Sequence, residues 1–316
     1  METIYVTQEK CSVKREGEHI KLVRMGQALA TVPLVNTRTI ILHDSVNITS
    51  PAMDLLLGKG IDIIYQSRTG KTKGRVISTK GGGAITRLAQ FAAFVNLNRR
   101  LEISKSIVSA KTQNQMSVVK KYQYYGKKDC FKDSLRLMKS YAEQLESADK
   151  IETIFGLEGM TAKIYWDCFR RVLKDHVFLR REYRPAHDYI NALLNLGYSF
   201  LAYEMTTCLL AKKFDLEIGF LHSIHYGRNS LALDMMEEFR PVFIDAWVLS
   251  IFNKHQLSAS HFENIEGDWR LTGSGFGKFC RLYHERMPLW SSKFREQANN
   301  LKNALIMGEA YEPYLE

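Results

Sequence analysis

Short runs of alternating apolar and polar residues fill the first eighty residues, and these runs are rich in β-branched side chains. Such alternation is typical of strands with one buried face. One helix is expected at residues 50–57, with Ser50 as its N-cap and Pro51 at its first position. The expected strands are residues 3–6, 12–14, 19–23, 29–33, 39–42, 61–65 and 75–78. The N-terminal part is therefore predicted to be a small β domain.

The pattern changes after the glycine run at residues 81–83. Beyond it, apolar residues recur at three- and four-residue spacing, which predicts amphipathic helices. The expected helices are residues 85–101, 131–145, 160–172, 189–210, 231–249 and 276–283. We therefore predict an α+β protein of two domains. A small β-sheet domain occupies residues 1–83, and a larger all-helical domain occupies residues 84–316.

Charge divides the chain unevenly. The 316 residues carry 44 Lys and Arg against 34 Asp and Glu, a net charge of +10. Residues 1–150 hold 25 of the basic and 13 of the acidic residues, so the basic excess lies entirely in this half. Such asymmetry is typical of a protein that binds a polyanion. Lysines at 120–132 are interleaved with tyrosines, a mixture that suits nucleic acid, although a soluble basic face is the alternative.

Several common classes lack their signatures here. No apolar run approaches the roughly 18 residues of a membrane span, and residues 1–6 do not form a secretory signal, so we expect a cytoplasmic protein. The five cysteines form no C-x-x-C pair, which argues against a zinc knuckle or a disulfide framework. Tyr65 stands where a P-loop would need its first glycine, and Pro288 where a zincin helix would need its second histidine.

Two short segments each hold a candidate metal ligand. Glu158 lies in a Gly-Leu-Glu-Gly run, where small neighbours would let an ion or a phosphate approach closely. The alternative is an acidic residue at a helix N-terminus, favoured by the helix dipole. His222 ends a Gly-Phe-Leu-His run, and here the alternative is a partly buried histidine with its hydrogen bonds satisfied. His225 could compete with it as a ligand.

A third segment gathers acidic residues. On a helix, Asp234 would share one face with Glu237 and Glu238, three and four residues later. Like charges at this spacing repel each other unless a cation or Arg240 neutralises them, and a solvated acidic face is the alternative. With one histidine and no cysteine, such a set suits Mn²⁺ or Mg²⁺ better than structural zinc. In a basic protein it indicates phosphoryl chemistry on DNA.

Four motifs occur in one order, at residues 156–159, 184–194, 219–222 and 233–241. In this order and at this spacing they resemble the CRISPR-associated integrase and endonuclease family, the "Cas one" proteins of spacer acquisition. The resemblance implies a divalent metal ion, Mn²⁺ or Mg²⁺, held by Glu158, His222 and Glu237, with Asp234 as a helper beside them. It also implies a homodimer joined through the β domains and a small ferredoxin-like partner, "Cas two".

The resemblance further implies the reaction. A prespacer 3′-hydroxyl would attack a phosphodiester of the CRISPR repeat by transesterification on double-stranded DNA. Tyr198 matches an aromatic position expected near the DNA, and Asn191 is expected to be a structural hydrogen-bonding residue. The phosphate contacts are predicted to come from Arg170, Arg171, Lys174, Arg180, Arg181, Arg184 and Arg240, the first four on one helix and the last nearest the metal.

Two other functions stay open on the sequence alone. One is a non-catalytic, basic nucleic-acid-binding scaffold that uses only the N-terminal half, whose binding would weaken steeply with salt. The other is a metal-dependent hydrolase of small phosphoesters. Metal-dependent cleavage or joining of DNA would distinguish a nuclease and integrase from the scaffold and from the small-phosphoester hydrolase.

Overall fold

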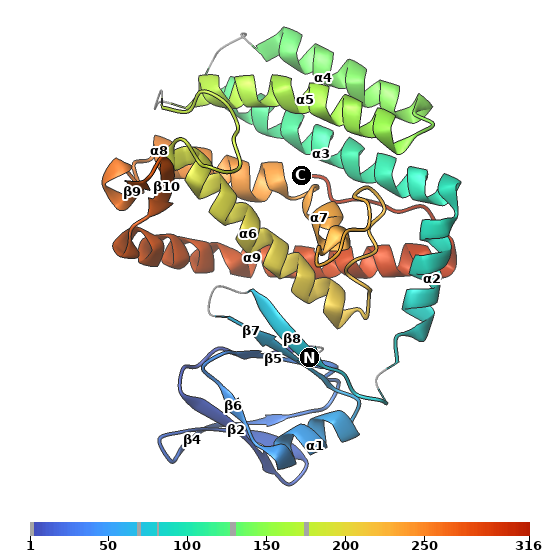
Figure 1. The fold of residues 1–316 in the computed structure, drawn as a ribbon, viewed down its shortest axis with the longest axis vertical. Coiled ribbons are helices and arrows are strands. Elements are labelled where there is room, and N and C mark those ends of the chain that lie inside the picture. Colours follow the sequence, from blue (N-terminus) through green and yellow to red (C-terminus); the bar gives the residue numbers. More distant parts are fainter. Residues whose placement is uncertain (1–2, 68–70, 81, 127–130, 174–176) are drawn as a thin grey trace. The chain divides into compact units, whose positions relative to one another are not determined.

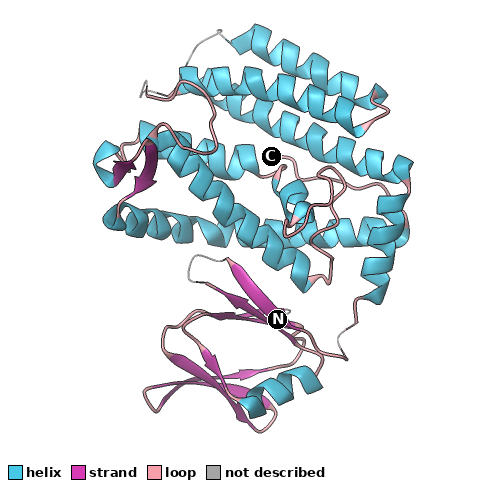
Figure 2. Cartoon of the chain, viewed as in Figure 1, coloured by secondary structure: helices cyan, strands magenta, loops and turns pink. Residues whose placement is uncertain are grey.

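The computed structural model describes residues 3–67, 71–80, 82–126, 131–173 and 177–316. Strands dominate the N-terminal part of the chain and helices the rest, so the predicted fold class is confirmed (Figure 2). The chain forms two compact units, one of residues 1–89 with 206–215 and one of residues 90–205 with 216–316. The domain boundary at residue 83 stays a prediction.

Two four-stranded sheets form the first unit (Figure 1). The strands of one sheet are, in order, β1 (Thr3–Val6), β5 (Thr39–His43), β7 (Asp62–Gln66) and β8 (Thr72–Val76). The strands of the other are β4 (Gln27–Pro33), β3 (His19–Arg24), β2 (Cys11–Glu16) and β6 (Asn47–Ile48). In the first sheet β5 pairs with β1 and with β7 in parallel, while β8 is antiparallel to β7. The predicted strands all exist, with ends that differ from the prediction by at most three residues.

The core of this unit is aliphatic. Ile40 on β5 and Ile63 on β7 are fully buried and share one hydrophobic cluster with Leu56 on α1 (Ser50–Gly58). The N-cap of α1 is Thr49 rather than the predicted Ser50, because Thr49 keeps an extended backbone (φ −81°, ψ 149°) and its N–H bonds to the second sheet.

Long helices form the second unit. The helix α3 (Leu97–Gly126) packs against α5 (Ile151–Val172), which packs in turn against α4 (Lys132–Gln144) (Figure 1). The other long helices are α6 (Tyr189–Ala211) and α9 (Gly273–Met307). Buried aromatic side chains from α6 and α9 meet in edge-to-face pairs, as between Phe200 and Phe279, and Trp247 of α8 (Ala246–Asn253) packs against Phe279 in a tilted pair.

Three predictions about the helices were wrong. Residues 85–101 are not one helix, because α2 (Ala84–Val95) ends before Asn96 and α3 begins after it. Residues 231–249 are divided among α7 (Ser230–Met236), a π-helical segment (Arg240–Asp245) and α8. The unit is also not entirely helical.

A two-stranded hairpin of β9 (Phe262–Ile265) and β10 (Asp268–Leu271) precedes α9. Its strands have four residues each, too short for their alternation to stand out in the sequence.

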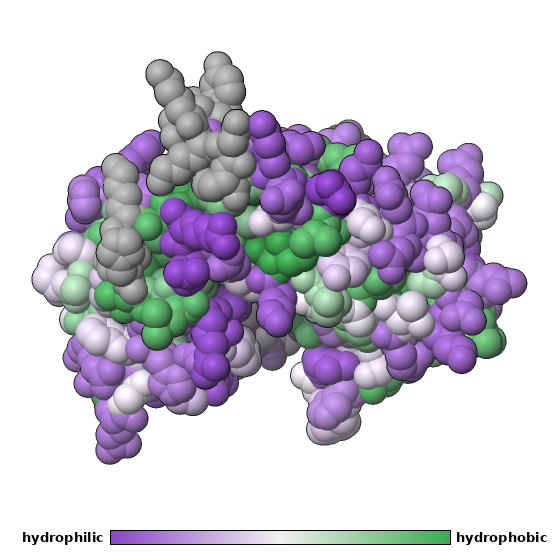
Figure 3. All heavy atoms as spheres, turned by 90° about the horizontal axis from the view of Figure 1, so that it is seen from above, coloured by the Kyte–Doolittle hydropathy of each residue, from purple (hydrophilic) through white to green (hydrophobic). Residues whose placement is uncertain are grey.

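Seen from the side of α4, the surface is mainly hydrophilic with scattered hydrophobic patches (Figure 3). Among the helices of the described residues, none combines the length and the apolar character that a membrane crossing requires.

Candidate metal and DNA site

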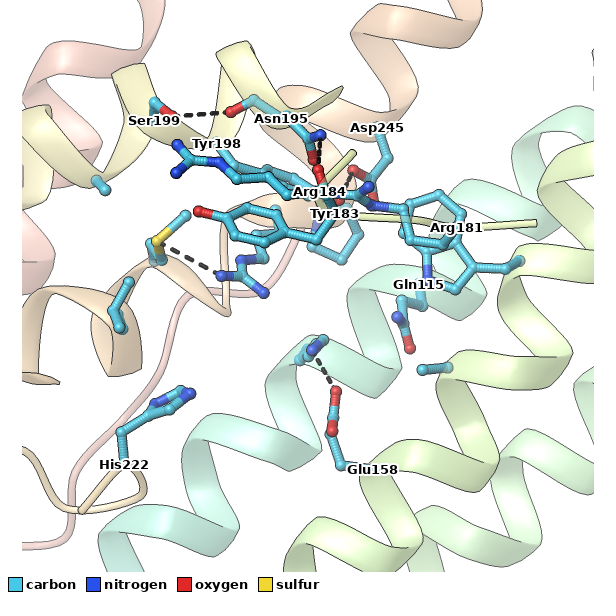
Figure 4. Close-up of a pocket in the computed structure, with 18 of the residues that line it drawn as sticks. Gln115, Glu158, Arg181, Tyr183, Arg184, Asn195, Tyr198, Ser199, His222 and Asp245 are labelled. Carbon is cyan, nitrogen blue, oxygen red and sulfur yellow. Dashed lines mark hydrogen bonds and ion pairs between the residues drawn. The ribbon is translucent and has the colours of Figure 1, made fainter. Parts of the chain in front are cut away.

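A cavity of about 720 Å³ opens among the helices of the second unit. Glu158 from α5 and His222 from the loop before α7 border it on different sides (Figure 4). Lys111 from α3 and Arg240 from the π-helical segment also line it. Side chains from four separate parts of the sequence therefore meet here.

Glu158 is a helical residue well inside α5. The helix begins at Ile151 and not at residue 160 as predicted, so the reading of Glu158 as an N-terminal acid is wrong. A Cβ atom added at Gly156 or Gly159 would have no neighbour within 4 Å. The glycines therefore leave the surroundings of this part of α5 open, as the sequence argument required.

His222 is oriented by Asp234. The Nδ1 atom of His222 lies 2.6 Å from Asp234 Oδ1, and that oxygen also accepts the N–H of His222 at 2.9 Å. The other oxygen of Asp234 accepts the N–H groups of Phe220 and Leu221. With Nδ1 engaged in this way, Nε2 is the nitrogen available to a ligand, an arrangement common at metal-binding histidines. The predicted role of Asp234 as a helper fits this geometry.

Gly219 permits the approach of this loop to α7. A Cβ atom at position 219 would lie 2.6 Å from Asp234 Oδ2 and 2.9 Å from the backbone of Ser230. Only glycine therefore lets the loop close on the buried carboxylate. His225, the competing ligand, is exposed and bonds to the carbonyl of Tyr226.

Glu237 and Glu158 are bridged by a lysine that sequence reasoning missed. The ammonium of Lys111 lies 2.5 Å from Glu158 Oε1 and 2.6 Å from Glu237 Oε2. The other oxygen of Glu237 lies 2.8 Å from Arg240 Nη1. Only 4% of the Glu237 side chain and 11% of the Lys111 side chain are exposed, so these charges neutralise one another away from water. The acidic segment is therefore not a solvated face.

The charges in this cluster shift one another's pKa values. Burial alone would raise the pKa of Glu237, but Arg240 and Lys111 outweigh it and lower that pKa below its usual value. Burial likewise opposes the charged form of Lys111, and Glu237 and Glu158 outweigh it and raise the pKa of the lysine. Both partners are thus held in their charged forms.

Two of the three predicted ligands, Glu158 and His222, line the cavity, and the third, Glu237, is joined to Glu158 through Lys111. Among the residues that the structure describes, no three histidine, cysteine or acidic side chains are grouped closely enough to hold an ion. The cation between Glu158 and Glu237 is Lys111 instead. Glu237 Oε2 makes no well-aligned hydrogen bond despite its short distance to that lysine. Two carboxylates, an available imidazole nitrogen and this unsatisfied oxygen fit a hard divalent ion.

Two arginines of the cavity wall lie over the ring of Tyr198. The guanidinium carbons of Arg181 and Arg240 lie 5.2 Å and 4.9 Å from the centre of its ring. Its hydroxyl bonds to Asp245, which Tyr165 also contacts at 3.0 Å. Burial raises the pKa of Asp245 to about 6 in spite of these two bonds. Tyr198 is 8% exposed, so its visible role is to orient the arginines, and its contact with DNA stays a prediction.

The predicted phosphate-binding residues divide into two groups. Arg181, Arg184 and Arg240 line the cavity (Figure 4 shows the first two). Arg170 and Arg171 instead pair with Asp167 on α5, at 2.8 Å and 2.6 Å.

Arg180 is mostly exposed and pairs with Glu182. The expectation that the first four residues share one helix is wrong, because α5 ends at Val172. Lys174 lies outside the described residues.

Asn191 is a structural residue, as expected. It is fully buried, its Oδ1 accepts from Arg181 Nη1 at 3.0 Å, and its Nδ2 donates to Asp188 at 2.7 Å. Asn191 therefore holds the segment that carries Arg181 against the start of α6. Asn191 thereby helps to hold Arg181 in place at the cavity.

Residues 4–285 match the sequence profile of the family described as CRISPR associated protein Cas1. This chain belongs to the Cas1 family. It is 31% identical to CRISPR-associated endonuclease Cas1 3 of Thermus thermophilus, over 90% of this chain and 84% of that protein. The family identification made from the ordered motifs is thereby confirmed, and so is the enzyme class, a CRISPR-associated nuclease.

Solved structures share the Cas1 fold over the whole chain. A chain of a partial Cas6-RT-Cas1–Cas2 complex superposes with a TM-score of 0.82 at 21% identity, covering 99% of this chain and 98% of that one. A casposase bound to its integration product gives a TM-score of 0.79 at 21% identity, with complete coverage of both chains. At these identities the likeness concerns the fold.

Proposed function

We propose that this Cas1 protein is the metal-dependent integrase and endonuclease of CRISPR adaptation, which joins prespacer 3′-hydroxyl ends to repeat phosphodiesters by transesterification. The observation that carries the proposal is the cavity that Glu158 and His222 line beside a row of arginines, with Glu237 joined to Glu158 through Lys111. Acidic ligands next to phosphate-binding cations are what a metal-assisted reaction on a phosphodiester needs.

Glu158, Glu237 and His222 Nε2 would hold the Mn²⁺ or Mg²⁺ ion. When bound, such an ion polarises the scissile phosphate and stabilises the charge that develops on its oxygens. Binding requires the Lys111 ammonium to leave its place between the carboxylates, because one position cannot hold both cations. The displaced ammonium would then lie at the edge of the cavity, within reach of a phosphate.

The remaining residues orient these groups and the DNA. Asp234 fixes the ring of His222 so that Nε2 is presented. Arg181 and Arg240 both lie over the ring of Tyr198, so their guanidinium groups are pre-organised for phosphate oxygens. Arg184 extends the same wall and is stacked on Tyr183.

The partners follow from the family. We propose double-stranded DNA, both prespacer and repeat, as the substrate, a homodimer joined through the β domains and a small Cas2 partner. Proteins of the same fold occur in a partial Cas6-RT-Cas1–Cas2 complex and in a casposase bound to its integration product, which supports these partners.

The test is an integration assay with the Cas2 partner, a prespacer and a plasmid that carries repeats, in Mn²⁺ or with a chelator. Glu158→Gln and His222→Ala should each abolish joined product while the proteins stay folded. For DNA affinity, Arg181→Gln should weaken prespacer binding severalfold, whereas the control Arg170→Gln should not, since Arg170 lies outside the cavity wall. Product at the wild-type level from the Glu158 and His222 variants, or in the presence of chelator, would refute the proposal.

A further inference from the structure

The C-terminal end of the chain returns to the segment that carries Glu237. α9 ends at Met307, and its C-cap Gly308 takes a left-handed conformation (φ 74°). Residues 311–316 then run along the buried side of Glu238 and Phe239, and we call them the C-terminal strap. The strap lies beyond residues 4–285, the part that the Cas1 profile matches.

The strap satisfies the side chain of Glu238. The hydroxyl of Tyr311 donates to Glu238 Oε1 at 2.5 Å, and the N–H of Tyr314 donates to Oε2 at 2.7 Å. Gln297 on α9 fixes the tyrosine in turn, because its Nε2 lies 2.6 Å from the Tyr311 hydroxyl and 2.7 Å from the carbonyl of Glu312. Glu238 is fully buried and both of its carboxyl oxygens accept hydrogen bonds from the strap, so its carboxyl serves this network rather than an ion.

Asn114 joins the strap, the acidic segment and α3 through one amide. Its Nδ2 donates to the carbonyl of Glu238 at 2.8 Å and to that of Tyr314 at 2.9 Å. Its Oδ1 accepts the N–H of Glu316 at 2.9 Å. Asn114 is 1% exposed and lies three residues after Lys111 on α3. The backbone next to Glu237 is therefore tied to the helix that carries Lys111.

Ring packing adds to these bonds. The ring of Tyr314 stacks on that of Phe239, with centres 4.8 Å apart and planes within 20°. Lys293 on α9 donates to the Tyr314 hydroxyl at 2.5 Å. Each of these contacts acts on the residues directly after Glu237, and no strap residue lines the cavity.

We propose that the strap and Asn114 are positioning elements that hold the Glu237 carboxylate at the separation from Glu158 that a metal ion requires. This inference rests on the proposed function, since it takes Glu237 as a ligand. Metal sites depend on the hydrogen bonds that orient their ligands, and a site placed 1 Å too loosely binds poorly. The strap fixes the side chain of the neighbouring residue, Glu238, and Asn114 fixes its backbone carbonyl. Those two anchors limit how far Glu237 can move.

The test measures Mn²⁺ affinity by titration calorimetry on full-length Tyr311→Phe and Asn114→Ala. Removing an orienting hydrogen bond around a metal site typically weakens binding by about tenfold or more, and we expect about tenfold for each variant. Integration should lose kcat while the KM for DNA is retained, because the strap does not line the cavity. Ile103→Val is the matched control, a buried truncation on α3 away from Asn114, and it should leave Mn²⁺ affinity unchanged.

Glu237→Gln separates the two proposals in the same titration. If Glu237→Gln weakens Mn²⁺ binding but folded Tyr311→Phe and Asn114→Ala bind the ion as the wild type does, the strap does not position the ligand and this inference is wrong. If Glu237→Gln also binds Mn²⁺ normally, the ion is not held by Glu237 and the proposed function fails instead. Asn114→Ala decides the question alone if Tyr311→Phe does not fold.

Discussion

Glu237 and Glu238 are adjacent in the sequence and both buried, yet their surroundings give them opposite chemistry. Glu237 lies between Arg240 and Lys111, two residues that line the cavity, and these cations lower its pKa against the effect of burial. Glu238 faces the strap, where burial raises its pKa to about 8 even though Tyr311 and the N–H of Tyr314 donate to it. Cations around Glu237 make it suitable as a metal ligand, whereas neutral donors around Glu238 make it a structural acid.

Exchanging each carboxyl for an amide gives the largest expected effect. Glu237→Gln removes a proposed metal ligand and should lower integration by about 100-fold or more, the usual scale for a lost electrostatic contact at a reacting phosphate. Glu238→Gln keeps an oxygen that accepts the N–H of Tyr314, so we expect a loss of less than about threefold. Initial rates of strand joining in Mn²⁺ measure both. Equal losses of strand-joining rate in the two variants would contradict the distinction between Glu237 and Glu238.

Removing the bridging lysine should have the next largest effect. Lys111→Met leaves two buried carboxylates without their shared counter-ion, which should cost about 3 kcal/mol of unfolding free energy in chelator. Saturating Mn²⁺ should restore most of this loss, because the ion replaces the missing charge. Denaturant unfolding with and without Mn²⁺ measures both the loss of unfolding free energy and its restoration.

Lys139→Met is the control for this experiment, since Lys139 is exposed and lies 3.7 Å from Glu143. The account would be wrong if Lys111→Met were as stable as the wild type in chelator, or if Mn²⁺ stabilised both proteins equally.

A smaller effect concerns pH. Burial raises the pKa of Asp245 in the folded protein to about 6, above its ordinary value of 3.8. A raised folded-state pKa gives stability that is complete below pH 3.8 and is lost as the pH rises through about 6. Asp245→Asn should therefore flatten this part of the stability profile. Urea unfolding at pH 4, 5, 6 and 7 tests it, and an unchanged slope in the variant would show that Asp245 does not titrate there.

Local pattern predicted the fold class and the approximate extent of most elements. The ligand candidates could be found because each lies in a recognisable motif, and the structure brings Glu158 and His222 to one cavity and links Glu237 to it through Lys111. The helix ends were less predictable. For example, α5 begins nine residues before the predicted start, since glycines at 156 and 159 resemble a break although they lie inside the helix.

Residues that depend on tertiary burial escaped the sequence analysis. Lys111 lies in a polar stretch of α3 that reads like a solvated helix face, and only the packing of α5 against α3 turns it inward. The one usable signal was the series of polar residues at 111, 114 and 115, which lie on one side of a helix. Tyr198, in contrast, was singled out by its motif. The motif suggested a contact with DNA, but only the structure shows that its hydroxyl is bonded to Asp245.

Anomalous scattering from crystals grown with Mn²⁺ would test the central claim most directly. We expect one strong peak coordinated by Glu158, Glu237 and His222 Nε2, with the Lys111 ammonium moved away from its place between the two carboxylates. A Mn²⁺ peak on other residues, or Lys111 still bridging Glu158 and Glu237 at saturating Mn²⁺, would contradict the account.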